Sequence, residues 1–187
     1  MAAYHGAFVM GEDDGSCQFY LSHERGILPL EGLKLSRSLR RTLAKSEFEV
    51  TFDQAFERVM RACRRPDGNW INEPIIAAYR KVHAEGWAHS CETWYAGELV
   101  GGVYGIAVGG CFFAESMFHR RTDAGMVALI SLLERCRQLG FQLFDTQTTT
   151  EHLLACGQIA LSHTEFMERL EKVLHQPTAW SRTFFRT

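Results

Sequence analysis

The stretch from Glu98 to Phe118 limits the fold more than any other part of the chain. It holds two apolar runs of strand-forming residues, which meet at Val108-Gly109-Gly110. Glycines tolerate the backbone angles of tight hairpin turns, so the sequence predicts two antiparallel strands joined at this point. Three glycines inside the first run, at 101, 102 and 105, would each weaken an ordinary strand. They indicate that a ligand or another backbone comes close there.

The segments around this strand pair alternate between helical and strand patterns. Apolar spacing and capping residues predict helices that start near Thr51, Asn72, Asp123, Glu151 and Ser162. Strands are expected at 27–30, where Pro29 indicates a sheet edge, and at 47–51, 88–95 and 141–147. A helix separates the last strand from the hairpin, so it should run parallel to its neighbour. The fold class is therefore α/β, a mixed central sheet flanked by helices, similar to the layout of GNAT acyltransferases.

Length, charge and cysteine usage exclude several classes of protein. The chain has 187 residues, enough for one compact core, and a net charge of −2, so any nucleic-acid contact must come from a local basic patch. It has neither an apolar run of membrane-spanning length nor a signal-peptide pattern at its N-terminus, so we expect a cytoplasmic protein without membrane contact. The six cysteines form no CxxC pair and the eight histidines lack zinc-site spacing. We expect reduced thiols, no metal and no cofactor.

Three polar residues stand at the ends of the predicted central strands. Glu115 closes an apolar run, and Asp145 and Gln147 close the strand that should lie beside it. Asp145 and Gln147 are two residues apart, so we expect both side chains to share one strand face and to point into the pocket. Strand ends of α/β sheets present functional groups, so these three side chains form a candidate site. The alternatives are a structural salt bridge for Glu115 and helix capping for Asp145.

Aromatic and basic residues supply the remaining candidates. Trp70 follows a turn-rich loop at 64–69, where a core tryptophan is less expected, and Phe112 lies on the central strand. Arg37, Arg40 and Arg41 would share one face of a helix, which is a phosphate-binding pattern but also an ordinary solvated surface. Residues 120–126 lack the glycine spacing of a coenzyme A pyrophosphate loop, so a coenzyme A donor is disfavoured.

Five short blocks, in this order, resemble the leucyl/phenylalanyl-tRNA–protein transferase family. They are Gly68-Asn69-Trp70-Ile71, residues 88–94, Glu98-Leu99-Val100-Gly101-Gly102-Val103-Tyr104-Gly105, Phe113-Ala114-Glu115-Ser116-Met117-Phe118, and Asp145-Thr146-Gln147. The resemblance runs from about Leu33 to Leu174. It implies transfer of leucine or phenylalanine from aminoacyl-tRNA to proteins that begin with a basic residue, which marks them for degradation.

The same resemblance implies roles for individual residues. Trp70, Phe112, Gly101, Gly102 and Val103 would bind the aminoacyl-adenosine end of the donor. Glu115, Asp145 and Gln147 would be the polar active-site residues, with Asp145, directly or through Gln147 or water, accepting a proton from the attacking amine. The terminal hydroxyl of the tRNA is the alternative proton carrier. The basic residues Arg37, Arg40 and Arg41 would contact tRNA, which favours phosphate binding over a merely solvated face.

The N-terminal region departs from the family pattern. Residues 1–32 are interpreted as a reduced arm, with Phe19-Tyr20-Leu21-Ser22 replacing the family's Trp-Trp-Ser-Pro and Arg25 retained, and residues 33–187 as the catalytic domain. A monomer is expected. Two other hypotheses remain open, namely an acyltransferase that uses another activated donor and a derivative that binds aminoacyl-tRNA or peptide without catalysis.

Overall fold

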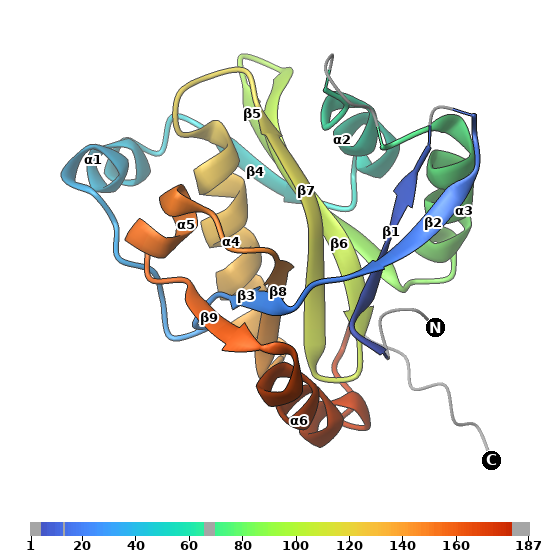
Figure 1. Cartoon of the computed structure of the whole chain (residues 1–187). Helices are drawn as coiled ribbons and strands as arrows, with labels where there is room; N and C mark the ends of the chain where they lie inside the picture. The colour runs from blue at the N-terminus through green and yellow to red at the C-terminus, as the bar shows by residue number, and fades with distance from the viewer. Residues whose placement is uncertain (1–4, 13, 66–69, 181–187) are drawn as a thin grey trace.

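The computed structural model describes residues 5–12, 14–65 and 70–180. Its centre is the predicted hairpin, formed by β6 (Glu98–Val108) and β7 (Cys111–His119) with Gly109 and Gly110 in the turn. Gly109 has a φ of +55°, which explains the glycine at this position. The predicted hairpin is therefore confirmed in position and direction (Figure 1).

Seven strands form the central sheet, in the order β4-β5-β6-β7-β8-β3-β9. Besides the hairpin, they are β4 (Glu49–Phe52), β5 (Ala88–Tyr95), β8 (Leu143–Gln147), β3 (Glu24–Ile27) and β9 (Ile159–Ser162). The β7–β8 pair is parallel and the other pairs are antiparallel, so the predicted mixed sheet is confirmed. A separate two-stranded sheet is made by β1 (Ala7–Gly11) and β2 (Cys17–Leu21).

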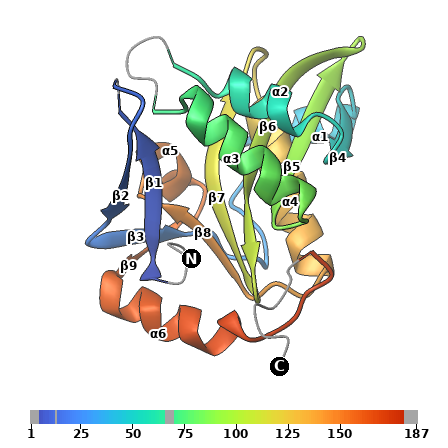
Figure 2. The same ribbon diagram turned by 90° about the vertical axis from the view of Figure 1, so that its right-hand side faces the viewer.

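Helices cover both faces of the sheet. Figure 2 shows α2 (Phe56–Ala62) and α3 (Glu73–Ala84) on one face and α4 (Ala124–Gln138) on the other. The remaining helices are α1 (Arg37–Lys45), α5 (Glu151–Ala155) and α6 (His163–Leu174). Asn72 caps α3, and Ser162 with Glu165 forms the predicted capping box of α6. The helices are thus set by local capping and by apolar faces that pack on the sheet.

Close packing between α4 and the sheet explains one of the strand glycines. A Cβ atom at Gly101 would stand 2.6 Å from the Ala124 carbonyl carbon, at the first turn of α4. The close approach expected at Gly101 is therefore made by another backbone.

Two local predictions are wrong. The helix expected at Thr51 begins only at Phe56, because Thr51 remains in β4 and its hydroxyl donates to the buried Glu92 carboxylate at 2.6 Å. The edge strand expected at 27–30 is instead β3, which ends at Ile27 before Pro29 and pairs on both sides.

The N-terminal region contributes to two sheets. β3 lies within the segment expected to form an arm, yet it pairs between β8 and β9. β1 and β2 form a separate hairpin, which is tied to the segment before α3 by a hydrogen bond from the Gly11 N–H to the Trp70 carbonyl at 2.8 Å (Figures 1 and 2). The boundary at residue 32 stays a prediction, and the turn predicted at 64–69 falls largely on residues 66–69, outside the described residues.

Cysteine burial agrees with the expectation from the sequence. All six cysteines are free; five are buried and Cys17 is exposed on β2. Across the described part of the chain, no helix combines the length and the apolar character needed to cross a membrane.

Candidate active site

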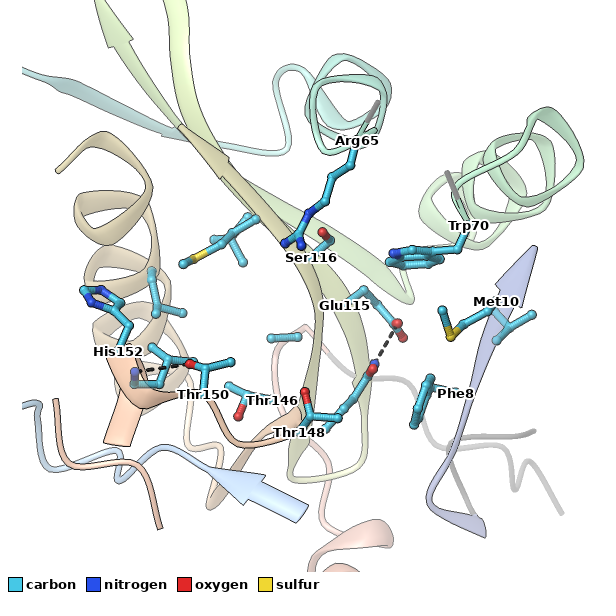
Figure 3. A pocket seen from close by; sticks show the side chains of 17 residues that line it. Phe8, Met10, Arg65, Trp70, Glu115, Ser116, Thr146, Thr148, Thr150 and His152 are labelled. Carbon is cyan, nitrogen blue, oxygen red and sulfur yellow. Dashed lines mark hydrogen bonds between the residues drawn. The ribbon is translucent and has the colours of Figure 1, made fainter. Parts of the chain in front are cut away.

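A cavity of about 590 Å³ lies between the β1–β2 hairpin and the ends of β7 and β8 (Figure 3). This volume falls in the usual range for small-molecule sites. Its lining combines aromatic and aliphatic side chains with several hydroxyls and one amide. The lining residues are Phe8, Val9, Met10, Arg65, Trp70, Val103, Ala114, Glu115, Ser116, Met117, Leu129, Thr146, Gln147, Thr148, Thr150, His152 and Leu153.

The cavity exists because the two central strands separate. The parallel pairing of β7 with β8 covers three residue pairs and ends at Phe113 and Asp145. On its other side, β7 shifts register against β6, so that Gly105 faces Ala114 while Tyr104 faces Ser116. Glu115 is the extra residue of this bulge. Bulges re-aim a side chain, and here the bulge places Glu115 at the point where the strands part.

Glu115 is held by two side chains from different elements. Its carboxylate accepts a hydrogen bond from Gln147 Nε2 at 2.8 Å and another from the Tyr79 hydroxyl on α3. Burial raises the pKa of Glu115 to about 7, although both hydrogen bonds act to lower it. The carboxyl group can therefore change its charge near neutral pH.

Asp145 forms a buried ion pair with Arg25. Arg25 Nε donates to Asp145 Oδ1 at 3.2 Å, and a second nitrogen of the same guanidinium contacts Oδ2. Asp145 is fully buried and does not line the cavity. Burial raises its pKa, while the Arg25 charge opposes that rise. The prediction that the Asp145 side chain faces the pocket is therefore wrong.

Asp145 still reaches the cavity through Gln147. The backbone N–H of Gln147 donates to Asp145 Oδ1 at 3.0 Å. Gln147 has a φ of +66°, a left-handed backbone that a residue other than glycine rarely adopts. This turn breaks the strand alternation and directs the Gln147 side chain to Glu115. The three predicted polar residues are brought together as a chain of contacts, in which Asp145 supports Gln147 from behind.

The five residues predicted to bind the donor do not all reach the cavity. Trp70 and Val103 line it, but Phe112, Gly101 and Gly102 do not. Phe112 is fully buried and stacks on Phe144 with ring centroids 5.3 Å apart. It lies on the strand face that packs against α4, where it forms core.

The basic stretch forms a helix, α1. Arg37, Arg40 and Arg41 are exposed on α1, whose N-terminus is capped by Ser36. The Thr42 hydroxyl donates to Asp123 at 2.7 Å and ties α1 to the start of α4. α1 lies on the far side of the molecule from the β1–β2 hairpin (Figures 1 and 2). Within the described residues, no hydrogen bond or ion pair involves the side chains of these three arginines, and their contact with tRNA stays a prediction.

Sequence reasoning missed several cavity residues. Phe8 and Met10 come from the segment expected to be an arm, and they lie on the same side of the cavity as Trp70 (Figure 3). The ion-pair role of Arg25 was also missed, although the family resemblance marked this arginine as retained. Tyr79 was missed as well: it lies in the core, and its hydroxyl reaches Glu115.

The cavity combines an apolar binding volume with side chains that can transfer protons, and its described side chains are not arranged as a metal site. Within residues 5–12, 14–65 and 70–180, no group of three or more His, Cys, Asp or Glu side chains is placed to hold a metal ion. The site combines an apolar volume, an indole, a carboxyl group with a pKa near neutrality and a fixed amide. This combination suits acyl transfer by alignment of two bound substrates.

Comparisons with known proteins agree on one family. The chain matches the model described as leucyl/phenylalanyl-tRNA protein transferase over residues 27–171. A curated leucyl/phenylalanyl-tRNA–protein transferase of Paramagnetospirillum magneticum is 47% identical over 182 residues, which cover 94% of this chain and 86% of that protein. One from Rubrobacter xylanophilus is 44% identical over 177 residues and covers 94% and 93% of the two chains.

Solved structures are more distant. A GCN5-related N-acetyltransferase-like protein from Streptococcus suis has a TM-score of 0.35 and 13% identity, with 81% of this chain and 55% of that chain covered. A likeness this weak says nothing about activity.

Proposed function

Because the chain belongs to the leucyl/phenylalanyl-tRNA protein transferase family, we propose that it transfers leucine or phenylalanine from aminoacyl-tRNA to the N-terminal amine of acceptor proteins. The acceptors begin with a basic residue, and the added residue marks them for degradation. A monomeric, cytoplasmic enzyme with a reduced N-terminal arm and a catalytic domain from residue 33 belongs to the same proposal.

One observation carries this proposal. Gln147 and Glu115 stand hydrogen-bonded at the wall of a cavity whose floor is apolar. Val103, Leu129 and Leu153 give that floor its aliphatic surface. Burying a leucine-sized side chain there is worth about 2 kcal/mol, which favours leucine or phenylalanine over small or charged residues.

The reaction needs little beyond alignment, since aminoacyl-tRNA is an activated ester. The acceptor nitrogen attacks the ester carbonyl, a peptide bond forms, and the ester bond to the ribose oxygen breaks. That ribose oxygen leaves as a hydroxyl, so it takes up the proton that the amine loses. Holding amine and ester in one dry cavity supplies most of the acceleration.

Gln147 and Glu115 act on the amine. Gln147 Nε2 donates its hydrogen bond to Glu115, so the side-chain oxygen of Gln147 is the atom that can accept a hydrogen bond from the incoming α-amine. Asp145 is buried and paired with Arg25, so it serves by fixing the Gln147 backbone. The proton then passes through Gln147 or water, or directly to the ribose oxygen. Glu115, when ionised, also attracts the cationic side chain of a basic acceptor residue.

The test is a matrix of donors and acceptors. Leucyl-, phenylalanyl-, arginyl- and glutamyl-tRNA, with acetyl-coenzyme A as a further donor, are each incubated with peptides that begin with Arg, Lys, Ala or Glu. We expect transfer from leucyl- and phenylalanyl-tRNA to the Arg and Lys peptides. Transfer only from acetyl-coenzyme A would indicate a different acyltransferase, and binding of tRNA without transfer would indicate a non-catalytic derivative. A preference for arginyl- or glutamyl-tRNA would contradict the apolar pocket.

A further inference from the structure

Arg65 differs from the other arginines around it. Arg61 binds the carboxylates of Glu57 and Glu73, each at 2.8 Å, and Arg64 binds Glu73 at 2.6 Å. Of the two more distant ones, Arg58 lies over the ring of Trp94 and Arg80 contacts Glu57 at 3.1 Å. Arg65 is exposed, and none of the hydrogen bonds or ion pairs found among the described residues involves its guanidinium. Its charge is therefore available to a ligand.

The guanidinium of Arg65 points into the cavity. Figure 3 shows it reaching from the segment after α2 toward Ser116, on the same cavity as Trp70 and Glu115. Among the described lining residues, Arg65 is the single lysine or arginine. A partly apolar cavity thus has one permanent positive charge, well placed to attract an anion that enters with the substrate.

The indole of Trp70 indicates which kind of anion Arg65 would bind. Trp70 lines the cavity five residues after Arg65, and an aromatic ring is the usual stacking surface for a nucleobase. A guanidinium can donate two parallel hydrogen bonds to two oxygens of one phosphate. An indole and a guanidinium on one cavity together match a nucleoside phosphate rather than a free carboxylate.

We propose that Arg65 binds the 5′-phosphate of the terminal adenosine of the donor. This inference rests on the proposed function. The aminoacyl ester is attached to the 2′- or 3′-oxygen of that ribose, and the phosphate is attached to its 5′-oxygen. A donor whose ester reaches Gln147 must therefore bring a phosphate within one ribose of the reacting carbonyl. Arg65 faces the same cavity and neutralises that phosphate, while Glu115 stays next to the amine.

The experiment compares two minimal donors that differ by this one group. They are 3′-O-phenylalanyl-adenosine and its 5′-monophosphate, each used with an Arg-initiated peptide. For the unmodified enzyme, we expect a KM roughly ten- to a hundredfold lower for the phosphorylated donor, the usual scale for a charged hydrogen bond. In Arg65→Gln the ratio of the two KM values should fall toward one, while kcat for the phosphorylated donor changes much less.

Two further variants separate a contact from a general charge effect. Arg61→Gln removes the same charge four residues away, from a side chain that already has two acidic partners, and should keep the KM ratio. Arg65→Lys should retain part of the difference in KM between the two donors, because an ammonium keeps the positive charge but cannot form the bidentate hydrogen bond. A purely structural role of Arg65 would raise both KM values equally and would overturn the proposal. Equal losses in the Arg61 and Arg65 variants would do the same.

Equilibrium binding distinguishes failure of this inference from failure of the proposed function. AMP and adenosine are titrated into the unmodified enzyme and the Arg65→Gln variant. Tighter binding of AMP that disappears in the variant supports the phosphate contact even if no transfer is detected, in which case the aminoacyl-transfer proposal alone fails. Equal binding of AMP and adenosine by the unmodified enzyme, with active transfer, would overturn the role of Arg65 and leave the transferase function intact.

Discussion

Arg25 and Asp145 lie 120 residues apart in the sequence and form a buried ion pair at the base of the candidate active site. The side chains are 1% and 0% exposed. Arg25 also donates to the Gly6 carbonyl at 2.7 Å and lies over the ring of Phe166, 4.5 Å from its centroid. Each guanidinium nitrogen thus has a partner, which is the condition under which such a pair can be buried.

Replacing Arg25 by methionine should strongly destabilise the fold. The substitution leaves Asp145 buried without its counter-charge, and breaking a buried pair from one side costs about 3–5 kcal/mol. The free energy of unfolding, measured by urea denaturation, would report the loss. As a control, Arg137→Ala removes one side of an exposed pair with Glu134 and should cost at most about 1 kcal/mol. Similar losses in the two variants would mean that the buried pair has no special role.

Asp145→Asn and Gln147→Ala should each lower transfer roughly a hundredfold, the scale of a lost proton-transfer group that is well positioned. Gln147→Ala removes the amide that contacts Glu115. Asp145→Asn weakens the hold on the Gln147 backbone and also removes the counter-charge of the buried Arg25, so its transfer is measured under conditions where its unfolding curve shows it folded. Donor affinity should change little, because the donor rests on Trp70 and the apolar floor. Donor binding and single-turnover transfer are measured separately. Transfer at the unmodified rate in both variants would leave the ribose hydroxyl as the proton carrier.

Stability should depend on pH through Glu115. Burial raises its pKa in the folded state to about 7, above the value of 4.5 for an unperturbed carboxyl group. Between these values the folded state holds a proton that the unfolded state has lost, so stability falls as pH rises and levels off above about 7. Relative to Glu115→Gln, the unmodified protein should lose on the order of 2–3 kcal/mol between pH 4.5 and 7.5. A pH-independent difference between the two unfolding free energies would contradict the raised pKa.

Tyr79→Phe should shift the pH profile of transfer upward. The Tyr79 hydroxyl donates to the Glu115 carboxylate and lowers its pKa, so its removal should move ionisation of Glu115 to higher pH. The midpoint of the pH–rate profile is compared between variants with one acceptor peptide, so that titration of the acceptor amine cancels. Tyr20→Phe is the matched control, because it removes a tyrosine hydroxyl that donates to Glu12 on the exposed hairpin. An equal shift in both variants would exclude a specific effect on Glu115.

Replacing Arg37, Arg40 and Arg41 together by alanine should weaken binding of aminoacyl-tRNA and flatten its dependence on salt. Each phosphate contact contributes to the slope of affinity against ionic strength, so three lost contacts should reduce that slope by about 2–3. The transfer rate with aminoacyl-tRNA should fall relative to the rate with the minimal aminoacyl-adenosine donor. If both donors lose activity to the same extent, the helix is needed for structure rather than for tRNA binding.

Much of the sheet could be predicted from the sequence because its strongest signals are local. The turn at Gly109-Gly110 predicted that β6 and β7 pair antiparallel, and the helix between β7 and β8 predicted that these two strands run parallel. β9 was not predicted, and β3 was expected three residues too late and at an edge of the sheet. Both partners of β3 lie more than a hundred residues away in the sequence, so its central position cannot be read from a local pattern.

The candidate site was predicted in composition better than in geometry. Asp145 and Gln147 were expected to share a strand face, but the left-handed backbone of Gln147 turns its side chain away from that of Asp145. Phe112 has the residue type of a pocket wall, yet the face of β7 that it occupies is covered by α4. Which face of a buried strand meets a cavity depends on where neighbouring strands separate, and this is a property of the assembled sheet.

The place of β3 between β8 and β9 has a consequence for the order in which the molecule can assemble. During synthesis, β3 is made early, but both of its partner strands are made much later. The half of the sheet that contains β3 therefore cannot form until the chain has been synthesised to about residue 162. Arg25 stays hydrated until Asp145 arrives. Such distant pairing slows folding. Catalytic competence is therefore acquired last, and a prematurely terminated polypeptide would have the hairpin of β6 and β7 but no working site.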